Sequence, residues 1–378
     1  MSAPLVDARR SRRGRSSAGR RVVVIRPEVG GIAFVAAAGA DVVRATGADV
    51  LELVGRQGGS PALDAARLVW ANRHHIRTAD VVHVEVGVTA VSTFWIAVWA
   101  CALGARPVTV LHDGSVIVRA PGSGLIRTRP GRRDAIAHKL LAPAVDRPLR
   151  AWLAWRTRTW VTLTERARRD VAAAGLRPVA VVPLGADPPT ATSPPSECTT
   201  VVFAGFISPA KGLDLLVDAW EEVGEATGLR LVVVGDPGRQ NAEYASGLRA
   251  RLAGSAAPST WEGWVTDEDA FHTAIAEAAV VVLPYRRSNP ASGILIRAVV
   301  EGRAVLGTAV PAVEDFVVDG VSAAVVPCDD AEALADSLLE LARDPSARDA
   351  LGAAAGAWAS EHCTWQAYSD RLFDTWGW

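Results

Sequence analysis

The chain has 378 residues, of which 49% are hydrophobic and 21% charged. Two domains of ordinary size are expected from that length, and the composition excludes a disordered protein because it can fill large cores. The formal net charge of −1 gives the molecule as a whole no electrostatic case for binding nucleic acid.

The amino terminus is rich in arginine, with seven arginines between Arg9 and Arg21. The segment has no apolar period, so residues 1–20 are predicted to form a disordered basic tail. A twin-arginine export signal would continue into an uninterrupted apolar region, but Arg26 and Glu28 interrupt the one that follows. The four cysteines are far apart and form no CxxC pair, which is typical of reduced thiols. We therefore expect a cytoplasmic protein.

Strand, turn and helix alternate from Arg21 onward, which predicts an α/β protein with parallel sheets covered on both faces. The strands predicted in the first half are 22–25, 81–84, 108–111, 160–163 and 179–182. The uncharged segment 86–105 is nominally long enough to cross a membrane. Because it lies between two predicted strands, a buried crossover helix explains it better.

A proline-rich segment divides the chain at residues 186–198, where four prolines and the lack of an apolar period indicate a linker. The same alternation restarts after it, with strands predicted at 200–204, 230–234, 260–261, 280–283, 304–308 and 323–326. Helices are predicted at 330–343, 346–362 and 364–378. The expected domains are therefore 21–185 and 199–362, followed by a helix within 363–378.

Two segments of the second half join an apolar strand to a small-residue turn and a helix: FAGFISPAKGLDLLVDA (203–219) and LPYRRSNPASGILIRAVVEG (283–302). Such turns offer backbone N–H groups and a positive helix end to an anion such as a diphosphate. Lys211 adds a full charge beside the first turn, and Ser292 with Gly293 opens the helix of the second. The pair resembles the donor-binding half of the glycosyl transferases group 1 family, the retaining enzymes of GT-B fold.

This resemblance implies two Rossmann-like domains that face one another across a central cleft. The first would take the acceptor, the second the nucleotide sugar, and the last helix would pack back on the first domain. The implied reaction moves a hexose from a nucleotide diphosphate sugar to a hydroxyl of a glycan, lipid-linked or small-molecule acceptor, with retention. It needs no metal or other cofactor, because Lys211 and the N–H donors would stabilise the leaving diphosphate. The departing phosphate could itself take the proton of the acceptor, so no strong general base is needed.

The chain departs from the family pattern at three positions. Phe206 stands where an arginine usually precedes the lysine, and Asn289 and Arg297 stand where two glutamates usually lie eight residues apart. Asparagine can still bond sugar hydroxyls, and arginine can hold phosphate or ribose. A noncatalytic GT-B scaffold, or partner of an active transferase, therefore stays open as an alternative. An NAD-linked oxidoreductase is disfavoured because no GxGxxG follows the first strand.

The catalytic candidates are Lys211, His112 and Asp113. His112 ends a predicted strand at its carboxyl end, where open α/β sheets bind ligands, and family members carry a similarly placed histidine near the transferred sugar. An inverting enzyme would use His112 or Asp113 as its base, whereas a histidine here can also merely cap the strand. His83, also near a strand end, ranks below His112.

The candidates for donor binding lie in the turns after strands and around the two helix starts. They are Gly30, Gly31, Gly205, Phe206, Lys211, Gly235, Gly263, Trp264, Asn289, Ser292, Gly293, Ile294 and Arg297. Asp329 and Asp330 precede a helix, where a cap is expected rather than a metal site.

The stretch 147–160, RPLRAWLAWRTRTW, contains four arginines and three tryptophans. This composition suits the interface of an anionic membrane, which would place the protein peripherally on the inner face. A surface helix whose apolar face packs inward is the alternative, and the sequence does not decide between them.

Overall fold

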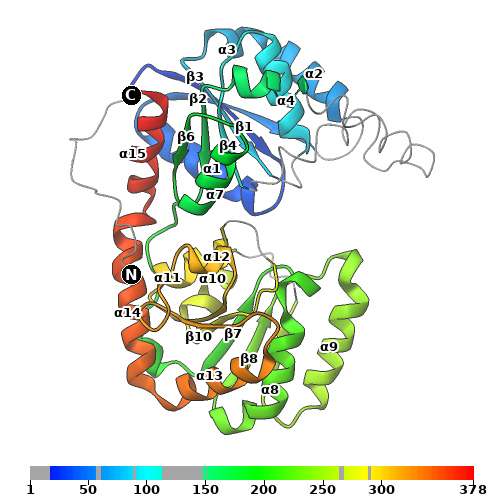
Figure 1. Cartoon of the computed structure of the whole chain (residues 1–378), viewed down its shortest axis with the longest axis vertical. Coiled ribbons are helices and arrows are strands. Elements are labelled where there is room, and N and C mark those ends of the chain that lie inside the picture. Colours follow the sequence, from blue (N-terminus) through cyan, green and yellow to red (C-terminus); the bar gives the residue numbers. More distant parts are fainter. Residues whose placement is uncertain are drawn as a thin grey trace.

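The computed structural model describes residues 18–56, 61–87, 91–112, 148–149, 151–263, 268–287 and 291–378. This part of the chain contains two six-stranded sheets, ordered β2-β1-β3-β4-β5-β6 and β12-β11-β10-β7-β8-β9. Neighbouring strands are parallel throughout. The two sheets form two α/β units, one from each half of the chain (Figure 1).

The first sheet consists of β1 (Arg21–Pro27), β2 (Asp49–Gly55), β3 (Val81–Val86), β4 (Val108–Leu111), β5 (Thr159–Thr162) and β6 (Val179–Val181). Its helices are α1 (Gly31–Ala45), α2 (Pro61–Ala71), α3 (Arg73–Thr78), α4 (Val91–Ala102) and α7 (Glu165–Ala173). All five predicted strands are confirmed, and β2 was missed. The expected crossover helix is α4. Within the described ranges, every helix falls short of the length or hydropathy that a bilayer crossing requires.

The second sheet consists of β7 (Thr200–Ala204), β8 (Arg230–Val234), β9 (Ser259–Glu262), β10 (Ala278–Leu283), β11 (Ala304–Thr308) and β12 (Ala324–Val326). Its helices are α8 (Leu213–Thr227), α9 (Ala242–Gly254), α10 (Glu268–Ala276), α11 (Gly293–Val300), α12 (Pro311–Glu314), α13 (Ala331–Arg343) and α14 (Pro345–His362). Every predicted strand of this half is confirmed. The central strands β10 and β11 are buried at each residue, as the strands of a sheet covered on both faces should be.

The last helix, α15 (Trp365–Trp376), returns to the first half of the chain. It continues the line of α14 alongside the first sheet (Figure 1). The Tyr368 ring lies against Gly39 of α1, where a side chain would leave it little room. Tyr368, Leu372 and Trp376 share one buried cluster with Val22 and other residues of the first half. The chain therefore closes by joining its two halves through a hydrophobic core.

The carboxyl edges of the two sheets face each other. Phe34, in the first turn of α1, makes an edge-on ring contact with His272 of α10, with centroids 6.5 Å apart. Arg166, in the first turn of α7, pairs with Glu314 of α12 at 3.1 Å and with Asp315 at 3.0 Å. Because a helix that follows a parallel strand starts at the carboxyl edge of the sheet, these contacts bring the ligand-binding edges together.

Candidate functional site

The turn after β7 packs directly against the end of β10. Gly212, with φ +66°, ends the 3-10 turn Pro209–Lys211 and starts α8. A Cβ at Gly212 would collide with the carbonyl oxygen of Pro284, so only glycine allows this approach. The backbone N–H groups of Arg286 and Arg287 donate to the carbonyl of Ala210 at 3.1 and 3.2 Å. The two turns singled out from the sequence are thus joined through their backbones.

Tyr285 connects the cation of the first turn to the helix start of the second. The Lys211 ammonium lies 3.7 Å from the centroid of the Tyr285 ring. The Tyr285 hydroxyl lies 3.0 Å from Oγ of Ser292, which caps α11 by accepting a bond from the Leu295 N–H. Tyr285 is 1% exposed, so its ring is a fixed support. The ammonium group of Lys211 and the positive amino-terminal end of α11 are therefore both held against Tyr285.

The glycine turns gather around the same place. A Cβ at Gly205 would come within 3.6 Å of the Ile294 side chain, and one at Gly235 would collide with the carbonyl of Gly205. Gly293, at the start of α11, has open space around it, as does Gly263 after β9. Gly205, Gly235 and Gly263 thus follow three adjacent strands, and Ile294 and Gly293 lie opposite the first of them. At such an edge a phosphate can approach the backbone N–H groups closely, because glycine has no side chain in the way.

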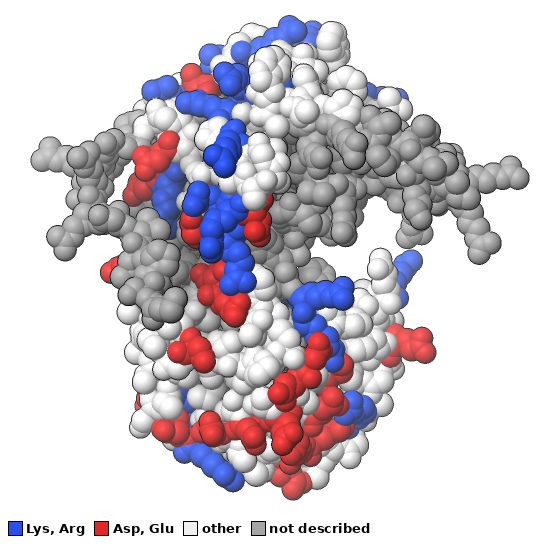
Figure 2. Space-filling view, in the orientation of Figure 1, with Lys and Arg blue, Asp and Glu red and all other residues white. Residues whose placement is uncertain are grey.

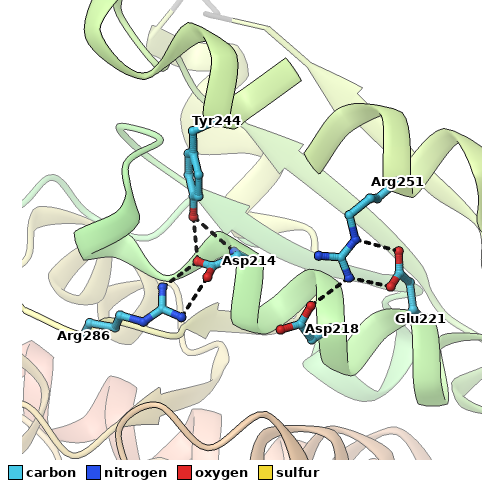
Figure 3. Close-up of polar contacts among 6 residues, drawn as sticks. All are labelled: Asp214, Asp218, Glu221, Tyr244, Arg251 and Arg286. Atoms are coloured by element: carbon cyan, nitrogen blue, oxygen red, sulfur yellow. Dashed lines mark hydrogen bonds and ion pairs between the residues drawn. The ribbon is translucent and has the colours of Figure 1, made fainter. Parts of the chain in front are cut away.

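Two arginines follow β10, and they differ in their surroundings: Arg286 is bound by carboxylates, whereas Arg287 is exposed. The Arg286 guanidinium donates to both carboxylate oxygens of Asp214, at 2.6 and 2.7 Å (Figure 3). It also pairs with Asp329. Tyr244 donates to the same carboxylate at 2.6 Å. Burial opposes ionisation of Asp214, but the bonds from Arg286 and Tyr244 prevail and lower its pKa. Arg286 therefore secures the first turn of α8.

Arg287 is exposed, and its side chain has no partner among the described residues. Sequence reasoning missed this cation, although the PYRR run placed it beside the second turn. Phe206, which replaces the usual arginine, is 55% exposed on the neighbouring turn. Arg287 thus offers a positive charge on the turn after β10, whereas Phe206 offers none on the turn after β7.

The predicted donor contact of Arg297 is corrected by the structure. The residue is 6% exposed, and its guanidinium pairs with Glu301 at 2.6 Å and donates to the Asp187 carbonyl at 3.3 Å. Glu301 in turn accepts from the backbone N–H groups of Thr190 and Ala191, both at 2.8 Å. The side chain of Arg297 lies on the face of α11 that packs against the linker, so it holds the linker instead of phosphate or ribose.

A buried carboxylate in the first half bridges two histidines. Glu85 of β3 lies with Oε1 2.8 Å from Nε2 of His83 and with Oε2 2.6 Å from Nε2 of His112. Burial alone would raise the pKa of Glu85, but the two imidazoles outweigh it and lower that pKa to about 2. The Nε2 of His112 is thus bonded to a carboxylate and not to a loop carbonyl. Sequence reasoning missed Glu85, although VHVEV places two polar residues on one face of an apolar strand.

The other candidates are either placed at the same edge or not described. Gly30, with φ +94°, and Gly31 start α1 with no atoms close to their missing side chains. Asp113, Trp264 and Asn289 lie outside the described residues, as does the run 113–147 that contains the first residue of the basic stretch.

Comparisons with known proteins agree with this geometry. Residues 198–344 match the model of the family Glycosyl transferases group 1. The lipopolysaccharide 1,2-N-acetylglucosaminetransferase of Salmonella typhimurium is 28% identical over 140 residues, which cover 33% of this chain and 34% of that protein. The match therefore spans about a third of the curated relative.

Solved structures resemble nearly the whole chain. Anabaena Alr3699/HepE in complex with UDP has a TM-score of 0.73 at 14% identity, covering 94% of this chain and 99% of its own. Sucrose-phosphate synthase from Thermosynechococcus elongatus has a TM-score of 0.69 at 15% identity, covering 95% and 98%. The expected GT-B fold, with two Rossmann-like domains, is confirmed.

Proposed function

We propose that the protein is a glycosyltransferase, because residues 198–344 in its carboxyl-terminal half match the model of the glycosyl transferases group 1 family. It moves a hexose from a nucleotide diphosphate sugar to an acceptor hydroxyl, with retention at the anomeric carbon. The observation that carries the proposal is the convergence of Lys211, Tyr285 and the capped start of α11. That arrangement presents a charge and backbone donors to one anion.

In this proposal the diphosphate lies between the turn after β7 and the start of α11. Negative charge gathers on the diphosphate as the glycosidic bond breaks, so Lys211 and the N–H donors stabilise the transition state more than the bound donor. Arg287 supplies a second cation in place of the arginine missing at Phe206. The departing phosphate takes the proton of the acceptor hydroxyl. Protein cations carry the charge, and no metal is needed.

The other residues are assigned roles by their places at the facing carboxyl edges of the two sheets. Gly235 and Gly263 border the donor, and the first domain supplies His112 next to the transferred sugar. Trp264 and Asn289 keep the donor-binding roles that the sequence predicts. UDP-glucose and UDP-N-acetylglucosamine are the first donors to test, because the HepE structures hold UDP and UDP-glucose and the Salmonella relative is named for N-acetylglucosamine. A glycoconjugate is the acceptor class to try first.

Peripheral binding to an anionic membrane from the cytoplasmic side is part of the proposal. Trp155 is 70% exposed with the Arg156 guanidinium 5.5 Å from its ring, and Trp70 is 63% exposed with that of Arg73 at 5.1 Å. Exposed tryptophans paired with arginines suit a lipid interface.

Co-sedimentation with vesicles of phosphatidylglycerol and phosphatidylcholine tests this surface. The double variant Trp70→Ala, Trp155→Ala should bind at least about fivefold more weakly. The matched control, Val318→Ala with Val321→Ala, removes two exposed apolar side chains from the second half and should bind normally. Equal binding of the tryptophan variant would contradict the membrane role.

Release of UDP from the two sugar nucleotides, with and without added acceptors, tests the transferase activity. Lys211→Ala should lower turnover by about 100-fold, the scale of losing one charged transition-state contact. Arg343→Ala removes an exposed cation at the end of α13 and serves as the control. Normal turnover in the Lys211 variant would refute the placement of the diphosphate.

A noncatalytic scaffold is the second candidate, and the position of Arg297 favours it. The place of a family glutamate is taken by a side chain that is committed to the linker. Protein that binds UDP but turns over none of the common sugar nucleotides would establish this alternative. Anomeric analysis of the product by NMR separates retention from inversion.

A further inference from the structure

A polar cluster interrupts an apolar face of the first sheet. His83 and Glu85 alternate along β3, and Glu85 is in register with Val110 of β4, two residues before His112. All three polar side chains therefore point to one face. That face is otherwise apolar, since Val108, Val110 and the α15 residues Tyr368 and Trp376 belong to its buried cluster.

Glu85 is 1% exposed, and among the described residues neither a lysine nor an arginine is its partner. Burying a carboxylate is costly unless its oxygens are bonded, and two apolar residues would fill the same space without that cost. The titratable groups facing it are His83 from its own strand, His112 from β4 and Tyr368 from α15. Packing alone therefore does not explain a carboxylate at this position.

The geometry fixes the protons of the imidazoles. An ionised carboxylate only accepts, so each histidine must carry a proton on the Nε2 that faces it. In the neutral ring of His112, Nδ1 then keeps its lone pair. His112 is the most exposed of the three and directly follows β4 at the edge that faces the second half of the chain.

His83 holds the carboxylate from the other side. Its Nε2 binds Oε1, its ring contacts Trp376 edge-on at 5.7 Å, and its Nδ1 is buried without a hydrogen-bond partner in the part of the chain that the structure describes. With Oε1 restrained in this way, Oε2 is directed at His112. The order of the array, His83, Glu85, His112, thus runs from the core toward the interdomain face.

We propose that Glu85 is a positioning residue for His112, which it keeps in the Nε2–H tautomer so that Nδ1 accepts a hydrogen bond from a hydroxyl of the bound sugar or acceptor. This role rests on the proposed transferase function. Glu85 itself touches no substrate. Its effect on the reaction passes entirely through the ring of His112.

Glu85→Gln is the sharpest change, because glutamine keeps the shape but can accept from only one of the two rings through its oxygen. Its NH₂ group faces the other ring and requires a lone pair on Nε2, which favours the opposite tautomer. We expect kcat for UDP release from UDP-glucose or UDP-N-acetylglucosamine to fall about 10- to 100-fold, the scale of losing a partner that orients a functional imidazole. The KM for the donor should change less than about threefold, because the diphosphate is held by the other domain.

A double-variant cycle separates positioning from stability. In a His112→Ala background, Glu85→Gln should cost no further activity beyond about threefold, because the residue through which it acts is gone. Glu52→Gln makes the same chemical change on β2, where the carboxylate pairs with Arg26 and Arg44, and should leave kcat unchanged. An equal loss from Glu85→Gln with and without His112 would overturn the proposal, and so would full activity of the single variant.

The tautomer can be observed without turnover. Long-range ¹H–¹⁵N correlation of the wild-type protein should show His112 protonated on Nε2, and UDP-glucose should shift its Nδ1 signal. Protonation on Nδ1 in the wild type, or a signal indifferent to UDP-glucose, would overturn the role of Glu85. Absence of UDP release from both donors counts instead against the transferase function, and the tautomer still decides what Glu85 does.

Discussion

Replacing Arg297 by leucine distinguishes its observed role from the role expected from the sequence. The guanidinium and the Glu301 carboxylate are 2.6 Å apart, and the two side chains are 7% and 0% exposed. Removing one partner of a buried pair costs about 3–5 kcal/mol because the other charge remains buried. Glu301 retains the N–H donors of Thr190 and Ala191, so we expect the lower end, about 3 kcal/mol.

The free energy of unfolding is measured by urea denaturation at pH 7, together with the KM for the donor. Adding Glu301→Gln to Arg297→Leu removes the buried charge but keeps an acceptor for the linker, and should recover about 2 kcal/mol. A leucine variant within about 0.5 kcal/mol of wild type, with a donor KM raised tenfold, would refute the linker role. It would instead restore Arg297 as a donor ligand.

Four further outcomes are expected. Gly212→Ala should cost at least about 2 kcal/mol in urea denaturation, because its Cβ collides with Pro284, whereas Gly228→Ala, with nearly the same φ and open space, should cost about 1. Tyr285→Phe removes the bond to Ser292 but keeps the ring under Lys211, so unfolding should become easier by about 1 kcal/mol. Arg287→Ala should raise the donor KM about tenfold with unchanged stability, and the adjacent Arg286→Ala should lose stability. The lowered pKa of Glu85, about 2 in the folded state, stabilises the fold above pH 4.5, and the gain of about 3 kcal/mol should disappear as the pH falls toward 2. Glu85→Gln should remove that pH dependence in urea titrations between pH 7 and pH 3.

The sequence predicted the sheets well where their strands are buried on both faces. Strands such as β10 are then continuous apolar runs bounded by turns, which is a signal independent of the partner. The missed strand β2 lies at the edge of its sheet, and Glu52 on it pairs with Arg26 and Arg44. A charged residue on an edge strand weakens the apolar pattern, and the strand was missed although four of the five residues in the run 50–54 are apolar.

The strand, turn and helix order of segments 203–219 and 283–302 could also be predicted, because strand, small residues and helix start follow one another in the sequence. The role of Arg297 could not, since spacing fixes its place on α11 but not which neighbour its side chain meets. That neighbour is a linker more than 100 residues away, joined through Glu301. The pairing of Glu85 with His112, 27 residues apart, likewise depends on the register between β3 and β4.

One short helix, α11, connects the donor turn to the linker between the halves. Its first turn is capped by Ser292, which Tyr285 ties to the site of Lys211. At its last turn, Glu301 accepts from the linker backbone, and Arg303 just beyond donates to the Ser193 carbonyl at 2.8 Å. A rigid helix transmits a displacement from one end to the other. Under the proposed function, Arg297 therefore acts through the position of α11, because the helix whose start would face the diphosphate is also the helix that holds the linker.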